Sequence, residues 1–130
     1  MASTSNDSKP LSPHLQIWRW HATMATSILH RATGVALYAG AIVLTIWLGA
    51  AATGPGAYET VEGLLLSPLG RLVLFGFTYA GMFHLLSGIR HLIWDTGAGF
   101  APKAASTWSV FIILGAAVLT FVVWGAAYFA

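Results

Sequence analysis

The sequence predicts an all-α membrane protein with three transmembrane helices that run up, down and up. Hydrophobic residues make up 57% of the 130 residues and charged residues only 8%, whereas a soluble domain carries about 25% charged residues. Three segments have roughly the 20 apolar residues that a helix needs to cross a bilayer. We place these helices at about 24–53, 68–94 and 106–129, in a single membrane domain that covers 1–130.

The composition also excludes several classes of function. The chain has no cysteine, which rules out disulfides, iron–sulfur ligation and thiolate chemistry. The formal net charge of +2 is small and no basic run is present, which argues against nucleic-acid binding. The first ten residues contain Asp7, no arginine and no apolar core. They therefore predict neither a secretory signal nor a mitochondrial transit peptide.

A polar arm, residues 1–20, precedes the first predicted helix. It ends in Trp18, Arg19 and Trp20, which are typical of the headgroup region, where amphipathic rings and a long cationic side chain are both favourable. We interpret His14 and His21, on either side of this group, as surface or interface residues and not as metal ligands.

Four residues near the start of the first transmembrane helix share one face. Ser27, His30, Arg31 and Gly34 are spaced i, i+3, i+4 and i+7, which places them on the same side of a helix. An isolated arginine at the mouth of a membrane helix is usually a topological anchor. The hydroxyl and the imidazole beside this one favour a polar pocket for a carbonyl, a carboxylate or an anionic headgroup.

The second transmembrane helix contains the most informative residue, His84. It lies in an uncharged run, 72–89, and an ionisable side chain in hydrocarbon predicts a functional site. Gly76, Ala80, His84 and Gly88 recur every four residues and therefore share one helix face. This strip of small residues leaves room beside the imidazole for a flat ligand such as haem. The alternative is that the strip packs against another helix, with His84 hydrogen-bonded across that interface.

His91 follows His84 on the same face, about 10 Å nearer the membrane surface. Two imidazoles on one face of one helix cannot bind opposite sides of one iron, so a second axial ligand has to come from elsewhere. His30 lies near the mouth of its own helix, and we expect it to differ in depth from His84 by about 10 Å. An iron midway between them would then be out of reach of one ring.

The connections and the charges predict the topology. We expect a turn-rich loop at 53–60, a short surface helix at 61–66 and a break at 96–103 before an uncharged third helix. Three transmembrane helices leave the N-terminus and the second connection on the same side of the membrane. Lys9, Arg19, Arg31, Arg90 and Lys103 belong to that side, and only Arg71 to the other. The excess of cations predicts a cytoplasmic N-terminus.

Three motifs, in order along the chain, resemble the cytochrome b subunit of succinate dehydrogenase, the larger haem-b membrane anchor of respiratory complex II. They are KPLSPHLQI at 9–17, SILHRATG at 27–34 and HxxxGIRHLxWD at 84–95. The departures are mild: Lys9 stands where the family usually has arginine, and Trp18 stands where it usually has tyrosine.

This resemblance implies a subunit outside the catalytic core, without activity of its own, that helps to pass electrons from succinate to ubiquinone in the respiratory chain and the tricarboxylic acid cycle. A second membrane anchor would complete its helical bundle. FAD would lie in a flavoprotein subunit, and the iron–sulfur clusters in a second peripheral subunit that contacts the arm at 11–20. The location implied is the bacterial inner membrane, which the chain crosses several times from a cytoplasmic N-terminus.

The resemblance also implies roles for single residues. The family residue that matches His84 is an axial ligand of the haem b iron, and the partner anchor supplies the other histidine. Residues that match His30, Arg31 and His91 lie near the haem propionates. Those that match Ser27, Ile28 and Arg31 help to bind ubiquinone.

Two other functions fit parts of the sequence. A haem-free, quinone-binding anchor of another respiratory oxidoreductase would use the histidines only for packing or for the quinone. A small transporter or channel subunit would place His84 in a proton path. The sequence gives the transporter little support, since it predicts no second ionisable group deep in any transmembrane helix.

Overall fold

The computed structural model describes residues 19–130, which form four helices and no strand. The helices are α1 (Ala22–Thr53), α2 (Pro55–Leu66), α3 (Pro68–Asp95) and α4 (Pro102–Phe129). Three of them, α1, α3 and α4, are long and apolar enough to cross a membrane, which confirms the predicted all-α class. The predicted arm lies outside the described residues, except for Arg19 and Trp20.

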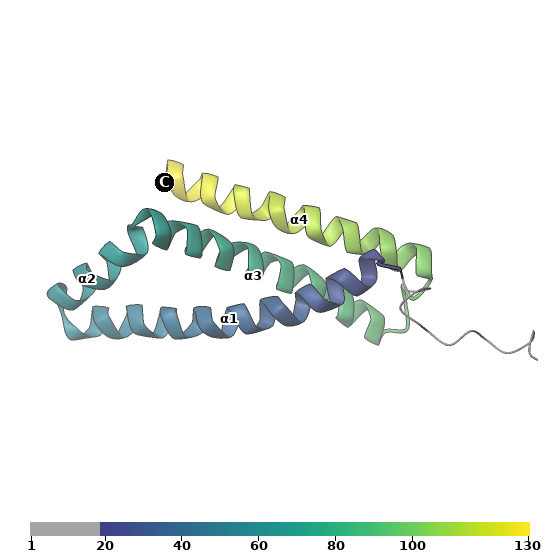
Figure 1. The fold of residues 1–130 in the computed structure, drawn as a ribbon, viewed down its shortest axis with the longest axis horizontal. Helices are drawn as coiled ribbons and strands as arrows, with labels where there is room; N and C mark the ends of the chain where they lie inside the picture. The colour runs from purple at the N-terminus through teal and green to yellow at the C-terminus, as the bar shows by residue number, and fades with distance from the viewer. Residues whose placement is uncertain (1–18) are drawn as a thin grey trace, which may run out of the picture.

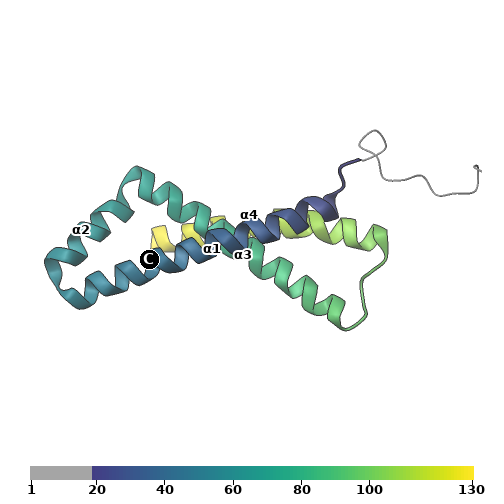
Figure 2. The same ribbon diagram turned by 60° about the horizontal axis from the view of Figure 1, so that its bottom comes forward.

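The three long helices run in alternating directions, with α3 packed against both α1 and α4 (Figure 1). Figure 2 shows α1 and α3 crossing near their middles and diverging toward both ends. The short helix α2 fills the gap at one end, and the connection from α3 to α4 lies at the other end, where α1 begins. The start of α1 therefore lies beside the last turns of α3 and the first turns of α4.

The apolar core is small, as expected for a membrane bundle whose outer surface faces lipid. Phe83, Ile112 and Ala116 are buried between α3 and α4, and Tyr79, Met82, Leu86 and Ile113 pack around them. Small residues allow the helices to approach closely: a Cβ added to Gly115 would lie 3.3 Å from the side chain of Leu86. Several buried residues are polar instead, and these are Thr26, Ser87, Arg90, Ser109 and Thr120.

The predicted loop at 53–60 is wrong, because α2 begins at Pro55 and continues to Leu66. One residue makes the turn: Gly54 has a φ of 131°, a conformation that favours glycine. Proline is well suited to the first position of a helix, where no backbone N–H is needed. The glycines and the proline that suggested a loop therefore end one helix and start the next.

A second tight corner joins α2 to α3 at Ser67. Its hydroxyl accepts a hydrogen bond from the backbone N–H of Gly70 at 3.1 Å, as a helix N-cap does. A Cβ at Gly70 would collide with the backbone carbonyl oxygen of Leu64, so this corner requires glycine. The connection after Asp95 is shorter than the predicted break, because α4 already begins at Pro102.

Candidate functional site

Three histidine rings form a stack between α1 and α3, which we call the histidine column: His84, His30 and His91. The ring centroids of His30 and His84 lie 4.0 Å apart with planes inclined by 15°. The centroids of His30 and His91 lie 4.9 Å apart at 29°. The expected difference in depth between His30 and His84 is therefore wrong, and so is the prediction that no second ionisable group lies deep in a helix.

The antiparallel packing of α1 and α3 explains this correction. His30 is the ninth residue of α1 and His84 lies eleven residues before the end of α3, so their rings meet at similar depth. Gly34, one turn after His30, makes the approach possible. A Cβ at Gly34 would lie 3.3 Å from Cε1 of His84, closer than nearly all real Cβ contacts. Spacing within each helix predicted the faces, but not the register between them.

A hydrogen-bond chain sets the tautomer of His84. The hydroxyl of Thr33 donates to the backbone carbonyl oxygen of His30 at 3.0 Å, and it lies 3.3 Å from Nδ1 of His84. A hydroxyl has a single hydrogen, so Thr33 accepts from the Nδ1–H of His84. Nε2 then carries the in-plane lone pair, as in a histidine that binds iron or zinc through one nitrogen while the other is held by a hydrogen bond.

Open space adjoins His84 on its own helix face. A Cβ added to Gly76 or to Gly88 would meet no atom within 4 Å, so within residues 19–130 the strip is not filled by a neighbouring helix at these two positions. Nδ1 of His30 is buried and has no hydrogen-bond partner. Ala80, between Gly76 and His84, is buried, so the strip is open only at its two glycines. The free lone pair, this open space and the unsatisfied polar atom fit a flat, metal-containing ligand such as haem.

The column also limits how a metal can bind. An imidazole binds a metal through a lone pair in its ring plane, at about 2.0 Å. His30 and His84 stack face to face, so their lone pairs lie in nearly parallel planes and do not converge on one iron. Residues 19–130 contain no group of three His, Cys, Asp or Glu side chains that could hold a metal ion. Among residues 19–130, His30 and His84 in this arrangement cannot hold one metal ion between them.

Ser27 and Arg31 lie one turn apart on α1 and touch, as their spacing predicted. Nη2 of Arg31 is 3.5 Å from the hydroxyl oxygen of Ser27, and its Nε donates to the Ser27 carbonyl oxygen at 3.4 Å. Both side chains are exposed, and Ile28 between them is 46% exposed. The hydroxyl, the guanidinium and an apolar side chain thus share an open face of α1, next to the histidine column but outside it.

The contacts of Arg90 were not predicted, since the sequence placed it only among the cations of one side of the membrane and within the third motif. The side chain is 4% exposed and donates to Thr26 of α1 at 3.2 Å and to Ser109 of α4 at 2.8 Å. Its guanidinium also lies over the ring of Trp94, 4.6 Å from the centroid. The one available signal was Ser87, which stands one turn earlier and lies 3.5 Å from Nη2. The partners on α1 and α4 leave no pattern in the local sequence.

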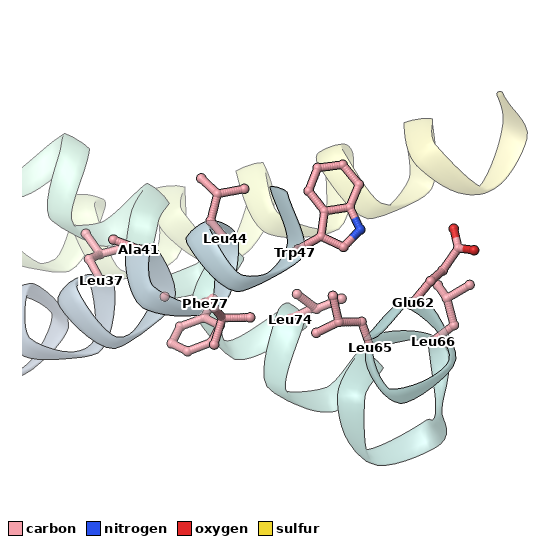
Figure 3. A pocket seen from close by; sticks show the side chains of 11 residues that line it. Leu37, Ala41, Leu44, Trp47, Glu62, Leu65, Leu66, Leu74 and Phe77 are labelled. Atoms are coloured by element: carbon pink, nitrogen blue, oxygen red, sulfur yellow. The ribbon is translucent and has the colours of Figure 1, made fainter. Parts of the chain in front are cut away.

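A large cavity lies at the other end of the bundle, between α1, α2 and α3 (Figure 3). Its volume is about 620 Å³, and its lining is apolar except for Glu62. The Tyr58 hydroxyl donates to Glu62 at 2.8 Å, and this bond to a carboxylate raises the pKa of Tyr58 above its usual value. None of the predicted site residues lines this cavity. It is separate from the histidine column.

Comparisons with known proteins agree with the motifs. Residues 5–123 match the family described as succinate dehydrogenase/fumarate reductase transmembrane subunit. The succinate dehydrogenase cytochrome b556 subunit of Paracoccus denitrificans is 43% identical over 119 residues, which cover 92% of each chain. That of Rickettsia conorii is 34% identical over 116 residues, 89% of this chain and 90% of the relative. The mitochondrial cytochrome b560 subunit of Sus scrofa is 42% identical over 112 residues, 82% of this chain and 64% of the relative.

Proposed function

Because this chain belongs to the succinate dehydrogenase/fumarate reductase transmembrane subunit family, we propose that it is a cytochrome b anchor subunit of complex II that holds haem b jointly with a second anchor. The relatives are cytochrome b subunits of succinate dehydrogenase, which lie outside the catalytic core of that enzyme. The single membrane-anchor domain, 1–130, would bring its transmembrane helices to a bundle that the partner anchor completes.

The observation that carries this proposal is the imidazole of His84, whose Nε2 is left free by the bond at Nδ1 and which adjoins unfilled space at Gly88. His84 would be one axial ligand of the haem iron, with a histidine of the partner anchor opposite. Haem b, when bound, supplies a one-electron carrier. His30, Arg31 and His91 would face the propionates, where the cation of Arg31 and the unsatisfied Nδ1 of His30 offer charge and a hydrogen bond.

The exposed face of Ser27, Ile28 and Arg31 would form part of the ubiquinone site. Quinone reduction adds two electrons and two protons, and negative charge develops on the carbonyl oxygens. The Ser27 hydroxyl can donate a hydrogen bond to such an oxygen, and the guanidinium of Arg31 stabilises the developing charge. Ile28 offers an apolar contact for the ring or tail. Electrons would arrive from the iron–sulfur clusters and FAD of the two peripheral subunits.

Purification of the complex through a tag on this chain tests the proposal. We expect four subunits to purify together: a flavoprotein, an iron–sulfur protein, a second small anchor and this chain. Dithionite reduction should produce the absorption bands of a low-spin b-type haem, and succinate should reduce added ubiquinone. A complete, active complex without haem bands would favour the haem-free anchor instead. Purification of this chain without the peripheral subunits would contradict the anchor role.

We further propose that the chain lies in the bacterial inner membrane with its N-terminus in the cytoplasm. The start of α1 and the α3–α4 connection share one end of the bundle (Figure 1). Among residues 19–130, four of the five lysines and arginines belong to that end, and such cations favour the cytoplasmic side.

Reporter fusions test this topology. Alkaline phosphatase joined after Thr53 or after Ala130 should be active, because both positions would lie in the periplasm, whereas a fusion after Gly97 should be inactive. The corresponding green fluorescent protein fusions should show the opposite pattern. Phosphatase activity at Gly97 would reverse the orientation, and a cytoplasmic signal from Ala130 would contradict the three transmembrane helices.

A further inference from the structure

Arg90 is a buried cation to which the proposed function gives no role. It is 4% exposed and lies on α3, a helix long and apolar enough to cross a membrane. A charged side chain at such a position is costly, and where it occurs it usually has a function. A guanidinium does not avoid this cost by losing its proton, because arginine stays charged in proteins.

The hydroxyls around Arg90 are arranged as hydrogen-bond acceptors. Nη1 donates to Ser109 at 2.8 Å and to Thr26 at 3.2 Å. The hydroxyls of Ser109 and Thr26 have backbone carbonyls of their own helices to donate to, at 2.9 Å and 3.0 Å, and lie 3.1 Å from each other. Since each hydroxyl has one hydrogen, their lone pairs are left for the guanidinium. This site, built from three helices, therefore suits a cation. If a neutral apolar side chain replaced Arg90, the hydroxyl oxygens of Thr26 and Ser109 would lose their donor.

The charge of Arg90 is solvated but not neutralised. The acidic residues among 19–130 are Glu59, Glu62 and Asp95, whereas the hydrogen bonds of Nη1 go to the hydroxyls of Ser109 and Thr26. Its other contacts are the hydroxyl of Ser87, 3.5 Å from Nη2, and the face of Trp94. Nε is buried without a hydrogen-bond partner. Within the described part of the chain, Arg90 therefore contributes a full positive charge to a region of low dielectric constant.

Arg90 also lies close to the proposed haem ligand. Its guanidinium is 4.6 Å from the centroid of Trp94, and the Trp94 ring meets His91 edge to face at 5.2 Å. His91 stacks on His30, which stacks on His84. Along α3 itself, the six residues from His84 to Arg90 correspond to about 9 Å of helix. The positive charge of Arg90 thus lies roughly 9 Å along the helix from the residue whose imidazole would bind iron.

We propose that Arg90 is a positioning residue that sets the midpoint potential of the haem site: held by Thr26, Ser87 and Ser109, its fixed positive charge favours the reduced state of a haem bound at His84. This inference rests on the proposed function. Adding an electron lowers the positive charge at the iron, so a nearby cation disfavours the oxidised state more than the reduced state. Coulomb's law over roughly 10 Å at an effective dielectric constant of about 20 predicts a shift of about tenfold in the redox equilibrium. For one electron this corresponds to about 59 mV.

Redox titration of the haem in the purified complex tests the charge directly. Arg90→Gln keeps an amide that can donate to the hydroxyls but removes the charge, so it should lower the midpoint potential by up to about 59 mV. Arg90→Lys keeps the charge without the planar fork and should remain close to the wild type. Arg71→Gln is the matched control, because it removes an exposed arginine from the far end of the same helix.

A second pair of variants, both at Ser109, tests the charge without removing Arg90. Ser109→Asp places a carboxylate beside Nη1, which Ser109 now contacts at 2.8 Å, and it should lower the potential in the same direction as Arg90→Gln. Ser109→Ala removes this acceptor but leaves the charge, so its potential should change little. This pair lies on α4, away from the histidine column, and it decides the question if Arg90→Gln does not assemble.

Three results would overturn the inference. Wild-type potentials in both Arg90→Gln and Ser109→Asp would show that the charge does not act on the haem. Equal lowering in Arg90→Gln and Arg90→Lys would show that geometry, and not charge, is responsible. Loss of assembly in both neutralised variants would make Arg90 a structural tie between helices. A wild-type complex without any haem would instead contradict the proposed function.

Discussion

Replacing His84 with leucine is expected to abolish the low-spin, six-coordinate haem spectrum of the purified complex. Leucine has a similar size but no lone pair, so the iron would lose one of its two axial bonds. The hydrogen bond that Nδ1–H of His84 donates to the Thr33 hydroxyl would be lost with it. Haem that remains bound through the partner anchor alone should be high-spin, and the haem content per flavin should fall.

His21→Leu is the control for this prediction. His21 is exposed, and within residues 19–130 its ring hydrogen-bonds only to the backbone carbonyl of Arg19, at 3.2 Å, so this variant should keep the wild-type spectrum. Thr33→Val should give an intermediate result, because loss of a hydrogen bond to a metal-bound histidine typically weakens the site by about 10–100-fold. An unchanged low-spin spectrum in His84→Leu would remove His84 from the site, and His91 would become the candidate ligand.

Ser27→Ala is expected to lower the rate of ubiquinone reduction by about 5- to 150-fold, while the haem content and the subunit composition stay unchanged. The loss of one donor to the substrate typically costs about 1–3 kcal/mol. Ser27 is exposed and its hydroxyl makes only a long contact, 3.5 Å, with Arg31, so the fold should tolerate alanine. Arg31→Lys keeps the charge and should lose less activity than Arg31→Gln.

Two measurements separate a quinone defect from a general defect. Succinate oxidation by a water-soluble artificial acceptor bypasses the membrane and should be unchanged in Ser27→Ala and in Arg31→Gln. Thr45→Ala provides the matched hydroxyl deletion on α1, because the Thr45 hydroxyl is exposed and donates only to the carbonyl of Ala41 at 2.8 Å. Normal quinone activity and inhibitor sensitivity in both Ser27→Ala and Arg31→Gln would mean that the partner subunits build the quinone site.

The helices could be predicted because their signals are local. Apolar runs of sufficient length led to three long helices, and the observed α1, α3 and α4 begin within four residues of the expected positions. The exception was the region from Gly54 to Leu66, where glycine and proline suggested a loop. The same two residue types also form a one-residue turn between helices, and only the backbone angles distinguish the two cases.

The candidate site was predicted only in part, because helix spacing fixes faces and not neighbours. The shared face of Ser27 and Arg31 follows from the helical repeat and is observed as a contact. The stack of His30 on His84 depends on the register of α1 against α3, and the missing side chain at Gly34 makes this close approach possible. No repeat within either helix contains that information.

The sequence by itself determined the class of the protein, the long helices, the faces that carry polar residues and, through three motifs, the family. These properties come from the helical repeat and from the energetic cost of polar groups in lipid. Tertiary structure alone decided which polar groups meet: His30 with His84, and Arg90 with Thr26 and Ser109. These pairs join residues 54, 64 and 19 positions apart in the chain. Such contacts form only when antiparallel helices pack in one register, and side-chain packing of small residues selects that register.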